Sequence, residues 1–203
     1  MAAAPLDIAN LALSFLGAGN IQSLTQPTNT ARVLNSEFTM TRDAELRAHV
    51  WKFAKTRAAL PALVTVPVSG PYNTQFALPD DCLRVLMVGD SYPGIDLQDY
   101  RMDPTNADYS VEGRNILTNL PAPLALLYIA QITDTTQFDA CFDIMFAAKL
   151  AWKCCERITQ SADKRKLAMS EYRTAMLDAI RSGAMEGVAD AIADGPWIVA
   201  RMQ

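Results

Sequence analysis

Hydrophobic residues recur at helical spacing near both ends of the chain and mix with turn residues in the middle. Near the N-terminus they follow the i, i+3, i+4, i+7, i+8 pattern of an amphipathic helix: Ile8, Leu11, Ala12, Phe15 and Leu16. Pro5 suits the first turn of a helix, and Gly17 suits the residue just after its end. The pattern therefore predicts a helix over residues 5–16.

A second helix is predicted over residues 30–59, which contain neither Gly nor Pro. Most of its apolar positions fall near one face, although Arg42 and Glu45 interrupt the stripe. At 1.5 Å per residue, one continuous helix here would be about 45 Å long. Pro61 is expected to end it.

The middle of the chain, residues 62–133, has the character of short strands. Seven prolines punctuate it, which favours short strands and edge loops. Val64, Val66 and Val68 alternate with small or turn residues. Residues 76–81 are predicted to form a strand that enters a turn, and residues 83–88 are compatible with a strand. Residues 109–117 are predicted to form a hairpin around Glu112-Gly113, and residues 124–132 a buried strand.

Helical spacing returns near Thr136 and continues to about Ile158, and again from Leu167 to about Arg181. Residues 159–163 form a short connection in which Ser161 could cap the next helix. A short connection makes two helices pack antiparallel. Gly183 and Gly187 are expected to mark the end of the last helix.

These elements predict a mainly α protein with an inserted small β subdomain. Residues 1–61 and 134–182 would form an antiparallel bundle of long helices, residues 62–133 the β-rich insertion, and residues 183–203 an extended tail. The tail ends in apolar residues, among them Trp197, Ile198 and Val199. It could fold back on its own core or dock into a neighbour, and we favour docking because exposed apolar segments mark interaction sites.

Composition excludes some classes of function. Half of the 203 residues are hydrophobic and 20% are charged, with a net charge of -4. Nonspecific binding of nucleic acid is not expected of an acidic chain, because such binding needs a basic face on the protein. The N-terminus lacks a basic leader, so no signal peptide is expected. Residues 8–31 carry no charge, but polar residues and Pro27 interrupt them, so no membrane span is expected.

The cysteines are spaced for neither metal nor redox chemistry. None of the four forms a Cys-x-x-Cys pair, and the chain has one His. We therefore expect no metal, no cofactor, and reduced, mostly buried thiols of a cytosolic protein.

Three arrangements could carry catalysis, and each also has an ordinary structural reading. Ser161 and Lys164 match Ser-x-x-Lys, but the companion motifs of that enzyme class are absent and a helix cap is the better reading. His49 follows Glu45 by four residues, a spacing that could orient a general base, but local spacing places no Ser or Cys beside it and a structural or surface His is the better reading. Asp43 with Glu45, or Asp80 with Asp81, could form a glycosidase pair, although adjacent acids are ordinary in turns.

The order of several segments resembles one known family, the head-to-tail adaptors of short-tailed bacteriophages, also called tail tubular protein A or connector gatekeeper. The likeness covers about residues 5–182. The segments that carry it are ANLALSFLGAGNIQSL, RDAELRAHVWKFAKTRAAL, YNTQFALPDDCLRVLMV, GRNILTN and LALLYIAQITDTTQFDACFDIMFAAKLA.

The resemblance implies a structural protein of the virion and no enzyme. Members form a ring, usually of about 12 copies, between the portal protein and the tail nozzle protein. The ring extends the channel for double-stranded DNA and helps retain it, without sequence-specific binding or a membrane. Before assembly the subunit would be in the host cytoplasm. The resemblance also implies that the C-terminal segment clasps the portal, so the expected docking residues are Pro196, Trp197, Ile198, Val199 and Arg201.

Two alternatives stay open. Some family members have been assigned a cell-wall hydrolase activity, whose catalytic residues do not carry over to this chain. A peptidoglycan hydrolase would here depend on carboxylates such as Glu45, Asp80 and Asp81. The other alternative is a bacterial helical module that binds a partner protein outside any virion.

Overall fold

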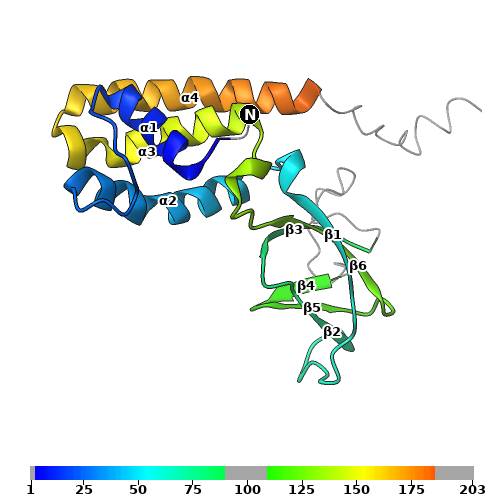
Figure 1. The fold of residues 1–203 in the computed structure, drawn as a ribbon. Helices are drawn as coiled ribbons and strands as arrows, with labels where there is room; N and C mark the ends of the chain where they lie inside the picture. Colours follow the sequence, from blue (N-terminus) through cyan, green and yellow to red (C-terminus); the bar gives the residue numbers. More distant parts are fainter. Residues whose placement is uncertain (1–2, 90–108, 186–203) are drawn as a thin grey trace, which may run out of the picture.

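The computed structural model describes residues 3–89 and 109–185, and these form a mainly α protein with a small β-rich part (Figure 1). The helices are α1 (Pro5–Leu16), α2 (Asn29–Ala48), α3 (Ala140–Thr159) and α4 (Ala162–Met185), with short 3-10 helices at Lys52–Ala54 and Thr135–Gln137. The strands are β1 (Lys55–Leu60), β2 (Thr74–Ala77), β3 (Cys82–Val88), β4 (Tyr109–Glu112), β5 (Asn115–Thr118) and β6 (Leu124–Ala130). The predicted fold class is confirmed.

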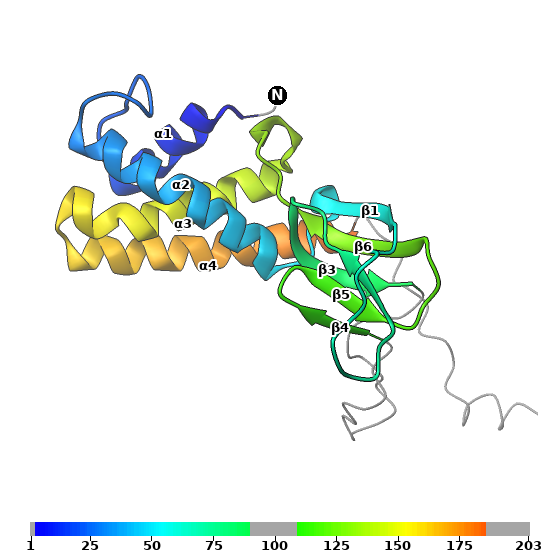
Figure 2. The same ribbon diagram turned by 90° about the horizontal axis from the view of Figure 1, so that it is seen from below.

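Helix α3 is the centre of the helical part, and it contacts α1, α2 and α4 (Figure 2). Asp139 caps its N-terminus, since the Asp139 carboxylate accepts a hydrogen bond from the Cys141 amide at 2.8 Å. Gln160 follows the C-terminus of the helix and adopts a left-handed conformation. The chain then reverses into α4, so α3 and α4 run antiparallel, as the short connection predicts.

Helix α4 is capped as predicted but ends later than predicted. Ser161 caps α4, since its hydroxyl accepts a hydrogen bond from the Lys164 amide at 3.4 Å. Helix α4 continues through Gly183 to Met185, beyond the predicted end at Arg181. The predicted tail residues Pro196, Trp197, Ile198, Val199 and Arg201 lie outside the described residues.

The prediction of one helix over residues 30–59 is wrong for residues 49–59. Helix α2 ends at Ala48, and His49 has extended backbone angles. The buried Trp51 then donates from its indole nitrogen to the Glu45 carbonyl at 2.9 Å, satisfying an acceptor in the last turn of α2. Residues 55–60 pair with β6 instead of continuing the helix. Strand pairing and burial of Trp51 thus override local helix propensity.

The strands form two antiparallel three-stranded sheets, ordered β1-β6-β3 and β2-β5-β4. The four strand and hairpin predictions for residues 76–132 are confirmed, and Gly113 adopts the positive φ of 60° that the tight β4–β5 turn requires. Val64, Val66 and Val68 belong to no strand and lie in the β1–β2 connection.

Strand β6 takes part in both hydrophobic cores. Leu127 and Ile129 belong to the core that includes the helices. Leu126 and Tyr128 belong to a second core, between the two sheets, together with Phe76. Because successive side chains of a strand point to opposite faces, β6 joins the helical part to the β-rich part.

Candidate interaction surfaces

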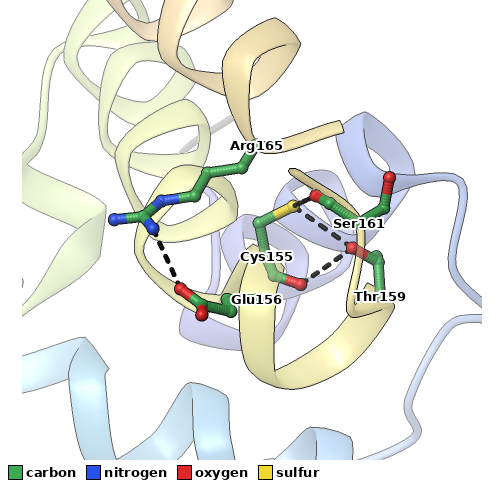
Figure 3. A network of polar contacts seen from close by, with 5 residues as sticks. All are labelled: Cys155, Glu156, Thr159, Ser161 and Arg165. Carbon is green, nitrogen blue, oxygen red and sulfur yellow. Dashed lines mark hydrogen bonds and ion pairs between the residues drawn. The ribbon is translucent and has the colours of Figure 1, made fainter. Parts of the chain in front are cut away.

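The Ser-x-x-Lys motif forms structural contacts at the α3–α4 turn. The Lys164 ammonium donates a hydrogen bond to the Leu16 carbonyl at 2.8 Å and so caps the C-terminus of α1. In Figure 3 the Cys155 sulfur lies beside Thr159 and Ser161, 3.3 Å from the Thr159 hydroxyl. Both motif residues therefore have roles in joining helices, which agrees with the helix-cap reading.

Figure 3 also shows an ion pair across the same turn, in which Arg165 of α4 contacts Glu156 of α3 at 2.9 Å. Both side chains are more than half exposed, so the pair contributes little to stability. The Cys155–Thr159–Ser161 contacts at the same turn are part-buried and link the last turn of α3 to Ser161.

His49 and Glu45 have separate surroundings. The His49 ring packs edge-on against Trp51, with ring centroids 4.9 Å apart. Burial, followed by the charge of Arg84, lowers the pKa of His49 from its ordinary value. The Glu45 carboxylate instead forms an ion pair with the Lys149 ammonium of α3 at 2.8 Å and accepts a hydrogen bond from the Tyr172 hydroxyl of α4 at 2.9 Å.

Glu45, Lys149, Trp152 and Tyr172 form a cluster that we call the Glu45 cluster. The Lys149 ammonium lies 4.2 Å from the Tyr172 ring centroid and 5.0 Å from that of Trp152, and the two rings stack. Burial, followed by the hydrogen bond to Glu45, raises the pKa of Tyr172. The cluster ties α2, α3 and α4 together. Its one sequence signal is the charge of Glu45 within an apolar stripe, and Lys149 has no comparable signal.

Two of the other candidate carboxylates, Asp81 and Asp43, also have structural partners. Asp81 accepts a hydrogen bond from the Tyr128 hydroxyl at 3.1 Å. Burial raises the pKa of Tyr128 to about 12, and the charge of Asp81 is the next largest cause. Asp43 pairs with Arg42 at 2.8 Å and accepts from the Gln131 amide at 2.7 Å. Asp81 and Asp43 therefore anchor strands and helices to one another.

Within residues 3–89 and 109–185 no group of three or more His, Cys, Asp and Glu side chains could hold a metal ion. In the same residues no helix is long and apolar enough to cross a membrane.

All four cysteines are free thiols. Burial raises the pKa of Cys154 to about 12, and the charge of Glu37 is the next largest cause. A thiol with so high a pKa is a poor nucleophile.

Among the described residues, the two most exposed large apolar side chains, Val64 and Val68, lie in the connection between β1 and β2. We call residues 61–73 the valine loop, because Val64, Val66 and Val68 are 100%, 69% and 104% exposed. The loop is nevertheless held at both ends. The Leu63 amide donates to the Gln75 carbonyl at 2.9 Å, and the Asn119 side chain donates to the Pro71 carbonyl at 2.9 Å. The loop thus presents its valines to solvent from an anchored base.

A second apolar surface lies on the helices. A shallow hollow of about 220 Å³ opens over α1, α3 and α4, and we call it the helix hollow. Phe15, Cys141, Ile144 and Ala175 supply its apolar lining, and Glu171 and Asp178 lie at the same site. Ile144 is 49% exposed although it belongs to the central helix. The helix hollow and the valine loop come from different parts of the fold.

Comparison with known proteins adds no relationship: no protein-family model matches the chain, and no curated protein matches it.

Proposed function

We propose that this protein is a structural head-to-tail adaptor of a short-tailed phage particle. In this proposal about 12 copies form a ring between portal and tail nozzle, which extends the DNA channel and helps retain packaged DNA. The subunit resides in the host cytoplasm before assembly and in the virion afterwards, and it catalyses no reaction.

The observation that carries the proposal is the presence of two different exposed apolar surfaces, the valine loop and the helix hollow. Subunits in a ring contact one another head to tail, so each copy must offer two distinct faces. Exposed apolar groups on an anchored loop are characteristic of a protein interface. We assign the valine loop to one face and the helix hollow to the other.

The surroundings of the candidate catalytic residues support a role without chemistry. Glu45 is engaged by Lys149 and Tyr172, and Asp81 by Tyr128. A glycosidase needs two carboxyl groups facing each other across a cleft that admits substrate. Carboxylates that join helices and strands are poorly suited to that task.

Assembly on the portal tests the proposal. Purified protein is mixed with the portal protein of the same genome, and ring formation is followed by size-exclusion chromatography and electron microscopy. A variant with Val64, Val66 and Val68 all changed to Ser should keep its fold but fail to form rings. Met40→Ser is the matched control, since Met40 is 75% exposed on α2, away from both surfaces. Absence of portal binding by the unmodified protein would refute the adaptor role.

Truncation after Gly195 tests the predicted docking residues separately. Removal of Trp197, Ile198 and Val199 should weaken portal binding at least tenfold, because aromatic and aliphatic anchors dominate interface energetics. The truncated chain should keep the melting temperature of the full chain. Unchanged portal affinity would remove the tail from the docking site.

A further inference from the structure

Three arginines surround a hollow between the helical and β-rich parts. Arg47 lies near the end of α2, Arg84 on β3 and Arg114 in the β4–β5 turn. We call the hollow, which has a volume of about 330 Å³, the arginine groove. All three residues are exposed, so their charges are accessible from solvent.

The arginines are positioned by backbone carbonyl groups. Arg47 donates to the Leu83 carbonyl, Arg114 to the Pro79 carbonyl, and Arg84 to the Arg47 carbonyl at 3.5 Å. A guanidinium has five N–H donors, so each arginine keeps several for a ligand. These contacts hold the side chains near one another despite their mutual repulsion, which is the arrangement of a preorganised anion site.

The positive charge of the groove is not neutralised by ion pairs within the described part of the chain. The ion pairs found there involve Arg42, Lys149, Arg157, Arg165, Lys166 and Arg181, and none of the groove arginines. The nearby carboxylates of Asp81 and Glu112 accept hydrogen bonds from the hydroxyls of Tyr128 and Ser110, at 3.1 and 3.4 Å, and form no ion pair with the groove arginines. The groove is thus a local positive site on a chain of net charge -4.

The groove also has apolar lining and strand edges. Val85 and Val111 contribute to its wall, and Val111 is 44% exposed. Among the described residues, β3 and β4 are each the edge strand of their sheet. Edge strands offer unpaired backbone groups to an extended segment. A ligand that suits all these features carries negative charges, apolar side chains and an extended backbone.

We infer that the arginine groove binds an extended acidic peptide segment of a partner protein. Its carboxylates pair with the guanidinium groups of Arg47, Arg84 and Arg114, and its aliphatic side chains contact Val85 and Val111. Duplex DNA fits less well, because the acidic chain repels a polyanion at long range and phosphates make no use of an apolar wall. The inference does not depend on the adaptor role.

Fluorescence anisotropy with the full chain tests this site. The probe is a labelled eight-residue peptide in which Asp or Glu alternates with Val, so that an extended backbone places acids on one face and valines on the other. The matched probe has Asn and Gln in place of the acids, and a 12-base-pair duplex is the third ligand. We expect the acidic peptide to bind at least tenfold more tightly than either of the others.

Variants test whether the acidic peptide binds in the arginine groove. The double substitution Arg84→Gln and Arg114→Gln should weaken the acidic peptide at least tenfold, whereas Arg173→Gln, on the exposed surface of α4, should change its affinity less than twofold. Equal affinity for the acidic and amide peptides would overturn the inference even if the double variant failed to fold. Failure of the acidic peptide to bind, preference for the duplex, or an equal loss in Arg173→Gln would also overturn it.

Discussion

The Glu45 cluster allows a quantitative test of what holds the helices together. The side chains of Glu45 and Lys149 are 5% and 15% exposed, and their charged groups are 2.8 Å apart. Changing Lys149 to Met keeps most of the side-chain volume but leaves the Glu45 carboxylate buried without its cation. Breaking a buried pair in this way costs about 3–5 kcal/mol. Loss of the cation–π contacts with Trp152 and Tyr172 adds about 0.5–2 kcal/mol.

The double variant Glu45→Leu with Lys149→Met separates the ion pair from the packing. With both charges removed, neither remains buried alone, and such replacements are often neutral or stabilising. The Tyr172 hydroxyl loses its acceptor, which costs about 1–3 kcal/mol. We therefore expect the double variant to be more stable than Lys149→Met. The coupling free energy between Glu45 and Lys149 should be about 2 kcal/mol or more.

Urea unfolding at pH 7 and 25 °C, followed by circular dichroism, measures these differences. Lys153→Met is the control, since Lys153 is exposed on the same helix, and it should change the free energy of unfolding by less than about 0.5 kcal/mol. A loss below 1 kcal/mol in Lys149→Met, or additive losses in the double variant, would refute the reasoning that the carboxylate depends on its buried cation.

Three further predictions concern single residues. Burial, followed by the charge of Asp139, raises the pKa of Asp143 from 3.8 to about 6. The folded state therefore holds this proton more tightly than the unfolded state, so the stability that the protonated carboxyl contributes is present below about pH 4 and is lost as pH rises to about 6. The stability of Asp143→Asn minus that of the unmodified protein should thus increase between pH 4 and pH 8 in urea titrations, and a constant difference would contradict the raised pKa. Phe142 is fully buried and contacts the rings of Trp51 and Phe138 at 5.0 Å, so Phe142→Ala should lower the free energy of unfolding by about 3–5 kcal/mol; a loss under 1 kcal/mol would mean that the site is not close-packed. Thr28 accepts from the Ala31 amide at 3.3 Å at the start of α2, so Thr28→Ala should cost about 1 kcal/mol in the same assay, with Thr28→Ser retaining most of the cap.

The helices and the hairpin were predictable because their signals are local. Pro5 and Gly17 bracket α1, and the left-handed conformation that Gly17 adopts there is the one expected after a helix. The end of α2 was not predictable in this way, since residues 49–59 contain no breaker. What ends the helix is the pairing of residues 55–60 with β6, a strand more than sixty residues away in sequence. Local propensity carries no information about that partner.

The candidate surfaces were partly visible in the sequence. Val64, Val66 and Val68 alternate with small or turn residues in the sequence, but only the fold shows that they lie on an exposed loop outside the sheets. The arginine groove had no signal, because Arg47, Arg84 and Arg114 are scattered along the chain. They meet only because α2, β3 and the β4–β5 turn converge.

The two-sided burial of β6 bears on how the proposed ring would close. A closed ring requires a fixed angle between the two contact faces of each subunit, because variation in that angle gives open or irregular assemblies. The valine loop is anchored to β2 and to Asn119, and β6 connects the sheets to the helices through Leu127 and Ile129. The hydrogen bond from Gln131 to Asp43 adds a polar link between the end of β6 and α2. These contacts restrain the valine loop relative to the helix hollow, so an adaptor built from this fold would meet its neighbours at a constant angle.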